Sequence, residues 1–311
     1  MLQSKYLSLL KQIQNDPGQN EAIERNDDKH CIVIAGPGTG KTRTLVLKAT
    51  KLLNETIHPP QGLACVTYAH SMAEELRQRL FELGVYKRRN VFIGTLHGFS
   101  LSNILVPFGR LYNYPLPNPL KVASDKQQAE IYREIWNALN FSNSIPSFEP
   151  ERDRIDNSFA DRLPIMFQKY RRTQLDGLQS PGANQHVEEL LEIYETTLLS
   201  HGFTDFDLQI KWAMKLVEDE AYVRDSLAAK YPWFLIDEYQ DLGLPLHRMV
   251  LSLTANTNMK LFAIGDPNQC IYDFSGASPA YLRELEMSNE RYGELLCFRW
   301  KWNFAPLKLV T

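Results

Sequence analysis

The sequence has few cysteines, and no two of them have the spacing of a metal-binding pair. Cys31, Cys65, Cys270 and Cys297 are its four cysteines in 311 residues, and none forms a C-x-x-C pair. A structural zinc or iron–sulfur site usually needs such pairs, so neither is expected. The first three cysteines lie in or beside apolar runs, which predicts buried free thiols in a reducing, cytoplasmic compartment.

Long apolar runs and a large net charge are also lacking. No run approaches the length of a membrane span, and the polar N-terminal segment does not resemble a signal peptide. That segment is instead typical of a surface helix with Tyr6, Leu9, Leu10 and Ile13 facing inward. The net charge of −3 gives no support for nucleic-acid binding by the whole surface, so any such binding needs a local groove.

Five short apolar runs predict a parallel sheet. They occupy residues 31–35, 63–67, 91–93, 234–236 and 261–264. Each run is nearly continuous rather than alternating, as expected for strands covered on both faces. Polar or glycine-rich residues follow every run, and ligands gather at the carboxyl ends of parallel strands. We therefore predict an α/β fold, with a parallel sheet flanked by helices and a ligand site at one edge.

The middle of the chain has a helical pattern. Ser124 begins an S-x-x-Q capping box, and apolar residues follow it at helical spacing. The strand pattern resumes only near Phe234. We predict a mostly α-helical subdomain at residues 101–200, inserted into a discontinuous domain formed by residues 1–100 and 201–295.

A glycine-rich segment follows the first predicted strand and precedes an apolar helix. Its glycines allow several backbone N–H groups to face a phosphate, and the helix N-terminus adds positive potential. The pattern is that of a Walker A loop, which predicts ATP and Mg²⁺ as ligands. Lys41 is expected to contact the β- and γ-phosphates, and the Thr42 hydroxyl to coordinate Mg²⁺. The predicted loop consists of Ala35, Gly36, Pro37, Gly38, Thr39, Gly40, Lys41 and Thr42.

Two adjacent acids, Asp237 and Glu238, end the fourth apolar run. Acids beside a buried strand are costly unless they meet a cation. Asp237 is predicted to hold magnesium, and Glu238 to orient and deprotonate the attacking water.

Several segments resemble the UvrD/Rep-type superfamily 1 helicases. Residues 237–241 (DEYQD) and 265–277 (GDPNQCIYDFSGA) resemble motifs II and III of that family. Weaker matches occur in the same order as in the family, at residues 17–19 (PGQ, the Q motif), 66–71 (VTYAHS, motif Ia), 94–99 (GTLHGF) and 203–207 (FTDFD). The resemblance covers almost the whole chain, although the insertion matches by position only. It implies a RecA-like domain that couples ATP hydrolysis to translocation on DNA.

The resemblance also implies roles for single residues. Gln19 would read the adenine edge, Arg43 would lie against the nucleotide, and Gln269 would sense the γ-phosphate. Aromatic residues in a groove would stack on the bases of single-stranded DNA, although each is also compatible with simple packing. The implied DNA-binding set is Thr67, Tyr68, Thr95, His97, Phe99, Tyr272 and Phe274.

The sequence departs from the family pattern in three places. Ser275 and Ala305 stand where many relatives carry arginine, and residues 296–311 resemble only the start of a second RecA-like domain. A second domain would supply an arginine finger, worth about 10³–10⁵ in rate. The ending is compatible with an engineered fragment, a natural truncation or a frameshift. ATP binding is therefore predicted more firmly than fast turnover.

Three functions remain open from sequence. The first is the motor half of a DNA helicase. The second is a catalytically incomplete ATP- and DNA-binding module that acts through a protein partner supplying the missing half. The third, a P-loop ATPase unrelated to nucleic acids such as a transporter ATPase, is opposed by GTLHGF and QCIYDF. DNA against RNA, oligomeric state and pathway are not decided, and no membrane association is expected.

Overall fold

The structure is a computed structural model that describes most of the chain. The described residues are 2–13, 17–24, 29–85, 90–141, 185–270, 277–287 and 296–300. The predicted site residues Tyr272 and Phe274, and the departures at Ser275 and Ala305, lie outside these ranges.

The predicted parallel sheet is confirmed, with one strand more than expected. Six strands lie in the order β3-β2-β4-β5-β1-β6, and all neighbouring pairs are parallel. The strands are β1 (Cys31–Ala35), β2 (Leu63–Thr67), β3 (Val91–Thr95), β4 (Trp233–Ile236), β5 (Lys260–Gly265) and β6 (Leu296–Trp300). β1 and β2 have the predicted bounds, and the other three predicted strands are extended by one or two residues.

The sixth strand, β6, extends the sheet at the edge next to β1. β6 pairs with β1 from Cys31 opposite Leu296 to Ala35 opposite Trp300. Residues 296–300 therefore extend the sheet, and the division of the chain into domains stays a prediction. Sequence analysis missed this strand because it considered only continuous apolar runs that are covered on both faces. β6 is an edge strand in which Cys297 and Arg299 are exposed, and Arg299 interrupts its apolar run.

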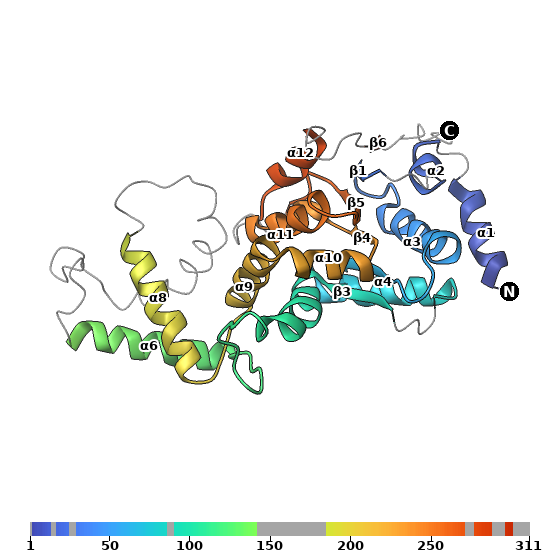
Figure 1. Cartoon of the computed structure of the whole chain (residues 1–311). Helices are drawn as coiled ribbons and strands as arrows, with labels where there is room; N and C mark the ends of the chain where they lie inside the picture. The colour runs from blue at the N-terminus through green and yellow to red at the C-terminus, as the bar shows by residue number, and fades with distance from the viewer. Residues whose placement is uncertain are drawn as a thin grey trace, which may run out of the picture.

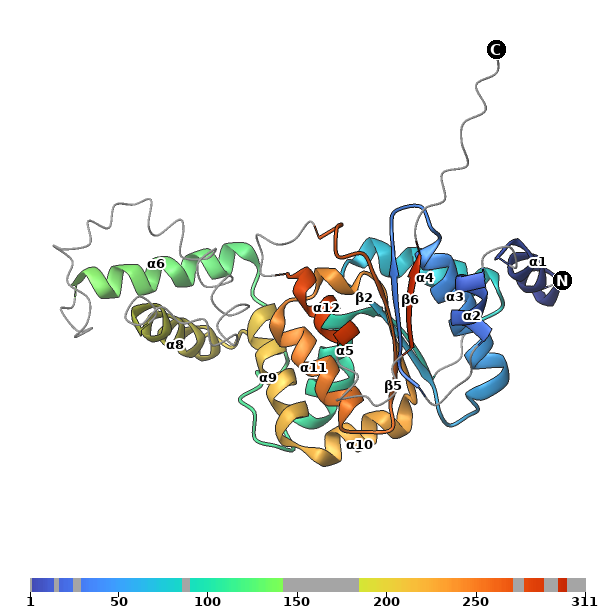
Figure 2. The same cartoon turned by 90° about the horizontal axis from the view of Figure 1, so that it is seen from above.

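Helices cover both faces of the sheet, which explains the continuous apolar runs. Val33, Cys65 and Phe262 belong to a core with α2, α3 and α4, whereas Ile32 and Ala64 belong to the opposite core. Figure 2 shows α1 to α4 on one side of the sheet and α5 and α9 to α12 on the other. Alternate residues of one strand thus enter two different cores, so every position is apolar.

The helices of the first side are α1 (Leu2–Ile13), α2 (Pro17–Glu24), α3 (Lys41–Lys51), continued by η1 (Leu52–Thr56), and α4 (His70–Glu82). Those of the second side are α5 (Leu96–Phe99), η2 (Ser100–Gly109), α9 (Phe206–Asp219), α10 (Ala221–Lys230), η4 (Tyr239–Asp241), α11 (Leu244–Ala255) and α12 (Pro279–Met287). No helix among the described residues is both long and apolar enough for a membrane span.

A helical pair extends away from the sheet. α6 (Asp125–Phe141) contacts α8 (Gln185–Ser200), and both lie beyond α9 in Figures 1 and 2. The predicted capping box is formed, because the Gln127 N–H donates to Ser124 Oγ (3.4 Å) and the Ser124 N–H donates to Gln127 Oε1 (2.9 Å). We propose that this pair belongs to the helical insertion, whereas η2 packs on α9 beside the sheet.

The strand order places three loops side by side. β4, β5 and β1 are neighbours, and their carboxyl ends lead into Asp237, Asp266 and the glycine-rich loop. Residues more than 190 positions apart in sequence therefore meet at one edge.

Candidate functional site

The glycine-rich loop has the backbone conformation that its sequence predicts. Gly38 (φ 71°) and Gly40 (φ 88°) adopt the left-handed backbone region, which is unfavourable for residues that have a Cβ atom. α3 begins at Lys41, directly after this turn. The loop is closed by a bond from Thr39 Oγ1 to the Gly36 carbonyl (2.8 Å), and Gln19 Nε2 donates to the Thr39 carbonyl (2.6 Å). The loop, the helix N-terminus and Gln19 thus form one unit.

Lys41 joins three strand ends. Its side chain is buried, and its Nζ donates to Gln269 Oε1 (2.7 Å) and lies 3.2 Å from Glu238 Oε2. These partners follow β5 and β4, whereas Lys41 follows β1. The structure therefore brings together the three residues that sequence analysis proposed as catalytic.

Asp237 lies beside Thr42 in the same cluster. Thr42 Oγ1 donates to Asp237 Oδ2 (3.3 Å), and the Asp237 side chain is fully enclosed. Burial, and secondly the negative charge of Glu238, raises the pKa of Asp237 to about 7, although Lys41 opposes the shift. An additional cation at this position would stabilise the ionised carboxylate.

Glu238 has a strained backbone and a supporting amide. It has φ 52°, one of two positive values among the described non-glycine residues. Gln240 Nε2 donates to Glu238 Oε2 (2.8 Å), and Gln240 Oε1 accepts from the Asp266 N–H (2.9 Å). A Cβ at Gly265 would lie 2.6 Å from Gln240 Oε1 and 2.8 Å from Leu282 Cδ2, so a larger residue there would displace the Gln240 amide. Such strain persists where the surrounding structure holds it, often at functional sites.

Gln240 was missed as a site residue. Its motif, DEYQD, was recognised, but the sequence contains nothing that shows one glutamine linking the loops after β4 and β5.

The contact of Arg43 with the nucleotide stays a prediction. Its guanidinium packs over Gly40, with Nη2 3.3 Å from where a Cβ on that glycine would lie.

The oxygen donors fit a magnesium ion. Mg²⁺ is usually held by one or two carboxylates together with waters and substrate phosphates, not by a full protein cage. The Thr42 hydroxyl and the Asp237 carboxylate supply such donors, and Thr42 Oγ1 lies 3.3 Å from Asp237 Oδ2. Within the described ranges no group of three or more His, Cys, Asp or Glu residues is arranged to hold a metal.

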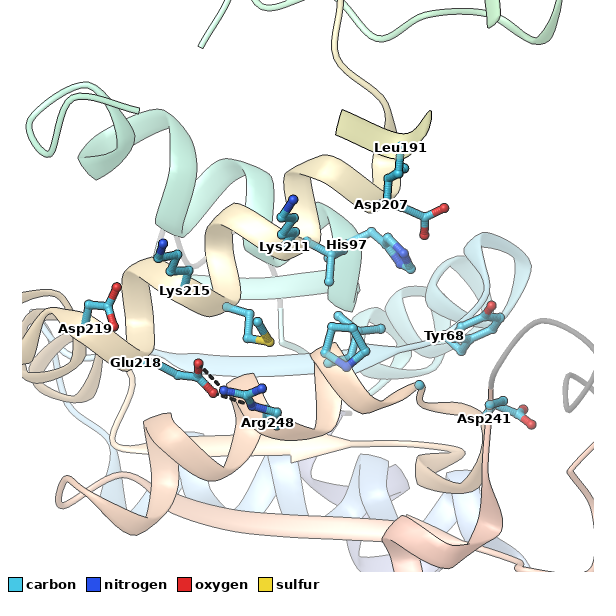
Figure 3. A pocket seen from close by; sticks show the side chains of 16 residues that line it. Tyr68, His97, Leu191, Asp207, Lys211, Lys215, Glu218, Asp219, Asp241 and Arg248 are labelled. Atoms are coloured by element: carbon cyan, nitrogen blue, oxygen red, sulfur yellow. Dashed lines mark hydrogen bonds and ion pairs between the residues drawn. The ribbon is translucent and has the colours of Figure 1, made fainter. Parts of the chain in front are cut away.

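A groove of about 320 Å³ lies on the second side of the sheet. Tyr68, after β2, and His97, in α5, line one part, with ring centroids 6.2 Å apart in an edge-to-face arrangement. Figure 3 shows both rings facing the groove, with Lys211 and Lys215 of α9 along its wall. Arg248 of α11 lies further along and binds both Glu218 oxygens (2.7 Å each). The groove thus combines apolar and aromatic walls with basic side chains.

The predicted place of Phe99 in the DNA-binding groove is wrong. It has no exposed surface and packs against Phe92, Tyr231 and Phe234, with ring centroids 5.3, 5.7 and 5.0 Å away. A base needs an exposed ring for stacking, so Phe99 is a core residue. It lies two residues beyond His97 in a short helix, and the backbone turn there directs the two side chains to different surroundings.

The two predicted DNA-contacting threonines have local contacts. Thr95 caps α5 by accepting from the Gly98 N–H (3.0 Å), and Thr67 Oγ1 lies 3.8 Å from Met72 Sδ. Both are buried. Their contact with DNA stays a prediction.

The parallel sheet and the Walker A loop at its carboxyl edge define an α/β protein of the P-loop class. The family model for the UvrD/REP helicase N-terminal domain matches residues 15–289. The chain belongs to this family, and its all-parallel sheet has the RecA-like fold expected for the domain.

Several curated relatives carry helicase names. A probable DNA helicase II homolog of Mycoplasma capricolum is 28% identical over 298 residues, covering 94% of this chain and 39% of that protein. The ATP-dependent DNA helicase Rep of Escherichia coli is 24% identical over 269 residues, covering 86% of this chain and 38% of the relative. The Gabija protein GajB of Bacillus cereus is 28% identical over 253 residues, covering 81% and 40%. The chain thus spans about two fifths of the length of these relatives.

Proposed function

We propose that the chain binds Mg-ATP and forms the ATP-binding motor half of a superfamily 1 DNA helicase. The observation that carries the proposal is the convergence of Lys41, Glu238 and Gln269 at the carboxyl edge of β1, β4 and β5. The names of the relatives, which include ATP-dependent DNA helicases, support the same reaction.

The phosphates are expected at the glycine-rich loop. Backbone N–H groups of residues 36 and 38–42 and the N-terminus of α3 supply positive potential, and Lys41 supplies a full charge. Lys41 is held by Glu238 and Gln269 in this structure, so a triphosphate would take over part of its bonding. Both partners would then be released toward the γ-phosphate.

Thr42 and Asp237 are the residues that would hold magnesium. When bound, the ion neutralises charge on the β- and γ-phosphates. Glu238 lies beside this position, held by Gln240, and accepts a proton from the attacking water. Gln269 is anchored by its own N–H, which donates to the Asp266 carbonyl (3.0 Å), and is placed to detect the γ-phosphate.

Single-stranded DNA is the proposed occupant of the groove beside Tyr68 and His97. Both rings are half-buried and accessible for stacking, which tolerates any base sequence. Asp241, from the motif of Asp237 and Glu238, also lines this groove. The nucleotide site and the groove therefore share one loop, through which nucleotide binding would alter DNA affinity.

The decisive experiment measures nucleotide binding and turnover with purified chain. Wild type should bind Mg-ATP, and Lys41→Ala should weaken binding at least about tenfold, because a charge-assisted bond contributes about 1.5–3 kcal/mol. Lys126→Ala, on the exposed face of α6, is the control and should bind as wild type. Equal affinity of wild type and Lys41→Ala would refute the nucleotide site.

ATP hydrolysis with and without single-stranded DNA then separates two functions. DNA-stimulated hydrolysis supports the motor half. Binding of both ligands without hydrolysis favours the catalytically incomplete module that acts through a partner protein.

A further inference from the structure

Lys48 is a lysine enclosed in an apolar core. It lies in α3 and is 1% exposed, with its Nζ 5.3 Å from the ring centroid of Trp233 and 5.9 Å from that of Phe262. Burial of an amine costs free energy unless its hydrogen bonds are made. An apolar side chain would fill the same space without this cost, so the amine requires a further explanation.

The hydrogen bonds of Lys48 and Lys51 explain why a buried amine is present. Lys48 Nζ donates to the Ile23 carbonyl (3.2 Å), and Lys51 Nζ donates to the Glu24 carbonyl (3.0 Å) and contacts the Glu24 carboxylate. Ile23 and Glu24 are the last two residues of α2, where helix carbonyls have no partner within the helix. Two lysines of α3 therefore cap the C-terminus of α2.

The other end of α2 carries Gln19. This side chain is 4% exposed, and its Nε2 donates to the Thr39 carbonyl of the glycine-rich loop (2.6 Å). α3 starts from that same loop at Lys41. α2 is thus tied at both ends to one rigid unit, and the lysines set where Gln19 lies relative to the phosphate site.

We infer that Lys48, assisted by Lys51, is a positioning residue for recognition of the nucleotide base. The inference rests on the proposed nucleotide site and the base-reading role of Gln19. The proposed phosphate contact of Lys41 and the proposed magnesium contact of Thr42 lie in a different part of the cluster, beside Gln269 and Asp237. Loss of the cap should therefore weaken selection of the base and leave phosphate binding unchanged.

The test compares ATP, GTP and inorganic tripolyphosphate by calorimetric titration with Mg²⁺. Lys48→Met keeps a similar volume but removes the Nζ donor to Ile23, together with the cation–π contacts of Nζ with Trp233 and Phe262. ATP affinity should fall about fivefold, the value of one hydrogen bond, while tripolyphosphate affinity stays unchanged. The ATP-to-GTP preference should fall equally. Gln19→Ala should have the same effect, and the double variant should show no additional loss.

Matched variants exclude a general structural effect. Lys48→Arg keeps a donor and should restore the preference for ATP. Thr50→Val removes a buried hydroxyl of α3 that donates to the Val46 carbonyl of the same helix (2.8 Å), and should leave all three affinities unchanged. Should Lys48→Met fail to fold by circular dichroism, Lys51→Met removes the second cap and should reduce the preference in the same direction.

Two results would overturn the inference. One is an equal loss of ATP and tripolyphosphate affinity in Lys48→Met, which would show a structural role. The other is an unchanged ATP-to-GTP ratio in a folded Lys48→Met or Lys51→Met. Equal tripolyphosphate affinity of wild type and Lys41→Ala would instead refute the nucleotide site. Failure of the inference and failure of the proposed nucleotide site are therefore distinguishable.

Discussion

At the scale of single residues, Asp237 shows a conflict between stability and chemistry. A carboxyl that is fully enclosed next to Glu238 opposes folding when it is ionised, and this is expressed in its pKa of about 7 against an ordinary 3.8. The same arrangement suits a site for a divalent cation. Residues that serve ligands often reduce stability in this way.

Asp237→Asn should therefore stabilise the ligand-free chain above pH 7. The folded state holds its proton more tightly than the unfolded state, so stability is lost as pH rises from about 4 to about 7, and the loss is complete above 7. Asn does not titrate, so we expect a gain of about 1–3 kcal/mol at pH 8 and a small difference at pH 4. Urea denaturation without nucleotide or Mg²⁺ measures it.

Asp225→Asn is the control, because Asp225 is exposed on α10, and it should change stability little at either pH. A stability gain for Asp237→Asn that is the same at pH 4 and pH 8 would contradict the assigned cause.

Alanine variants of Tyr68 and Phe99 should separate a residue of the groove from a residue of the core. Phe99→Ala should reduce the free energy of unfolding by about 3–5 kcal/mol, because it leaves a cavity among three aromatic rings. Tyr68→Ala should cost less stability but lower single-stranded DNA affinity, since stacking contributes about 1–3 kcal/mol per base. Urea denaturation and fluorescence anisotropy measure the two effects. Unchanged DNA affinity in Tyr68→Ala would remove this residue from the proposed DNA site.

At the scale of elements, His30 joins three strands. It precedes β1, its Nδ1 accepts from the Leu261 N–H of β5 (3.1 Å), and its carbonyl accepts from the Leu296 N–H of β6 (3.0 Å). Burial, and secondarily the charge of Lys260, lowers the pKa of His30 to about 4. The ring nitrogen that accepts the bond must be unprotonated, so the junction depends on a neutral histidine.

The sheet junction should weaken in mild acid. Between pH 6.5 and about 4 the unfolded chain takes up a proton at this histidine and the folded chain does not. The stabilisation is complete above pH 6.5 and is lost as pH falls to about 4, by about 1–2 kcal/mol after allowing for partial solvent screening. His30→Asn should be less stable at pH 7 but lose this part of the pH dependence in urea denaturation. If the pH dependence of stability is the same in His30→Asn as in wild type, this role of His30 is refuted.

At the scale of the whole molecule, the net charge of −3 limits how DNA is bound. The groove offers Lys211, Lys215 and Arg248, but Lys211 pairs with Glu195 (2.8 Å) and Arg248 with Glu218. Few phosphates are therefore neutralised, and stacking must contribute a large share of affinity.

DNA binding should depend only weakly on salt. Each neutralised phosphate of a single strand contributes a slope of about −0.7, so log affinity against log salt should be no steeper than about −2. Lys215→Ala should reduce the slope by about 0.7. Anisotropy titrations at several salt concentrations measure it, and a much steeper slope would place the DNA on another, more basic surface.

The sequence by itself determined the features that depend on residues close together along the chain, namely the strands and the glycine-rich loop. Continuous apolar runs predicted five strands because both faces of the sheet are covered, and Gly38 and Gly40 predicted the loop because only glycine adopts these angles freely. Tertiary structure alone decided the pairing of β6 with β1, the bridge of Gln240 between two loops, and the caps that Lys48 and Lys51 place on α2. It also placed Phe99 in the core and His97, two residues earlier, in the groove. Such contacts join residues distant in sequence, and their geometry depends on the order in which the strands pack.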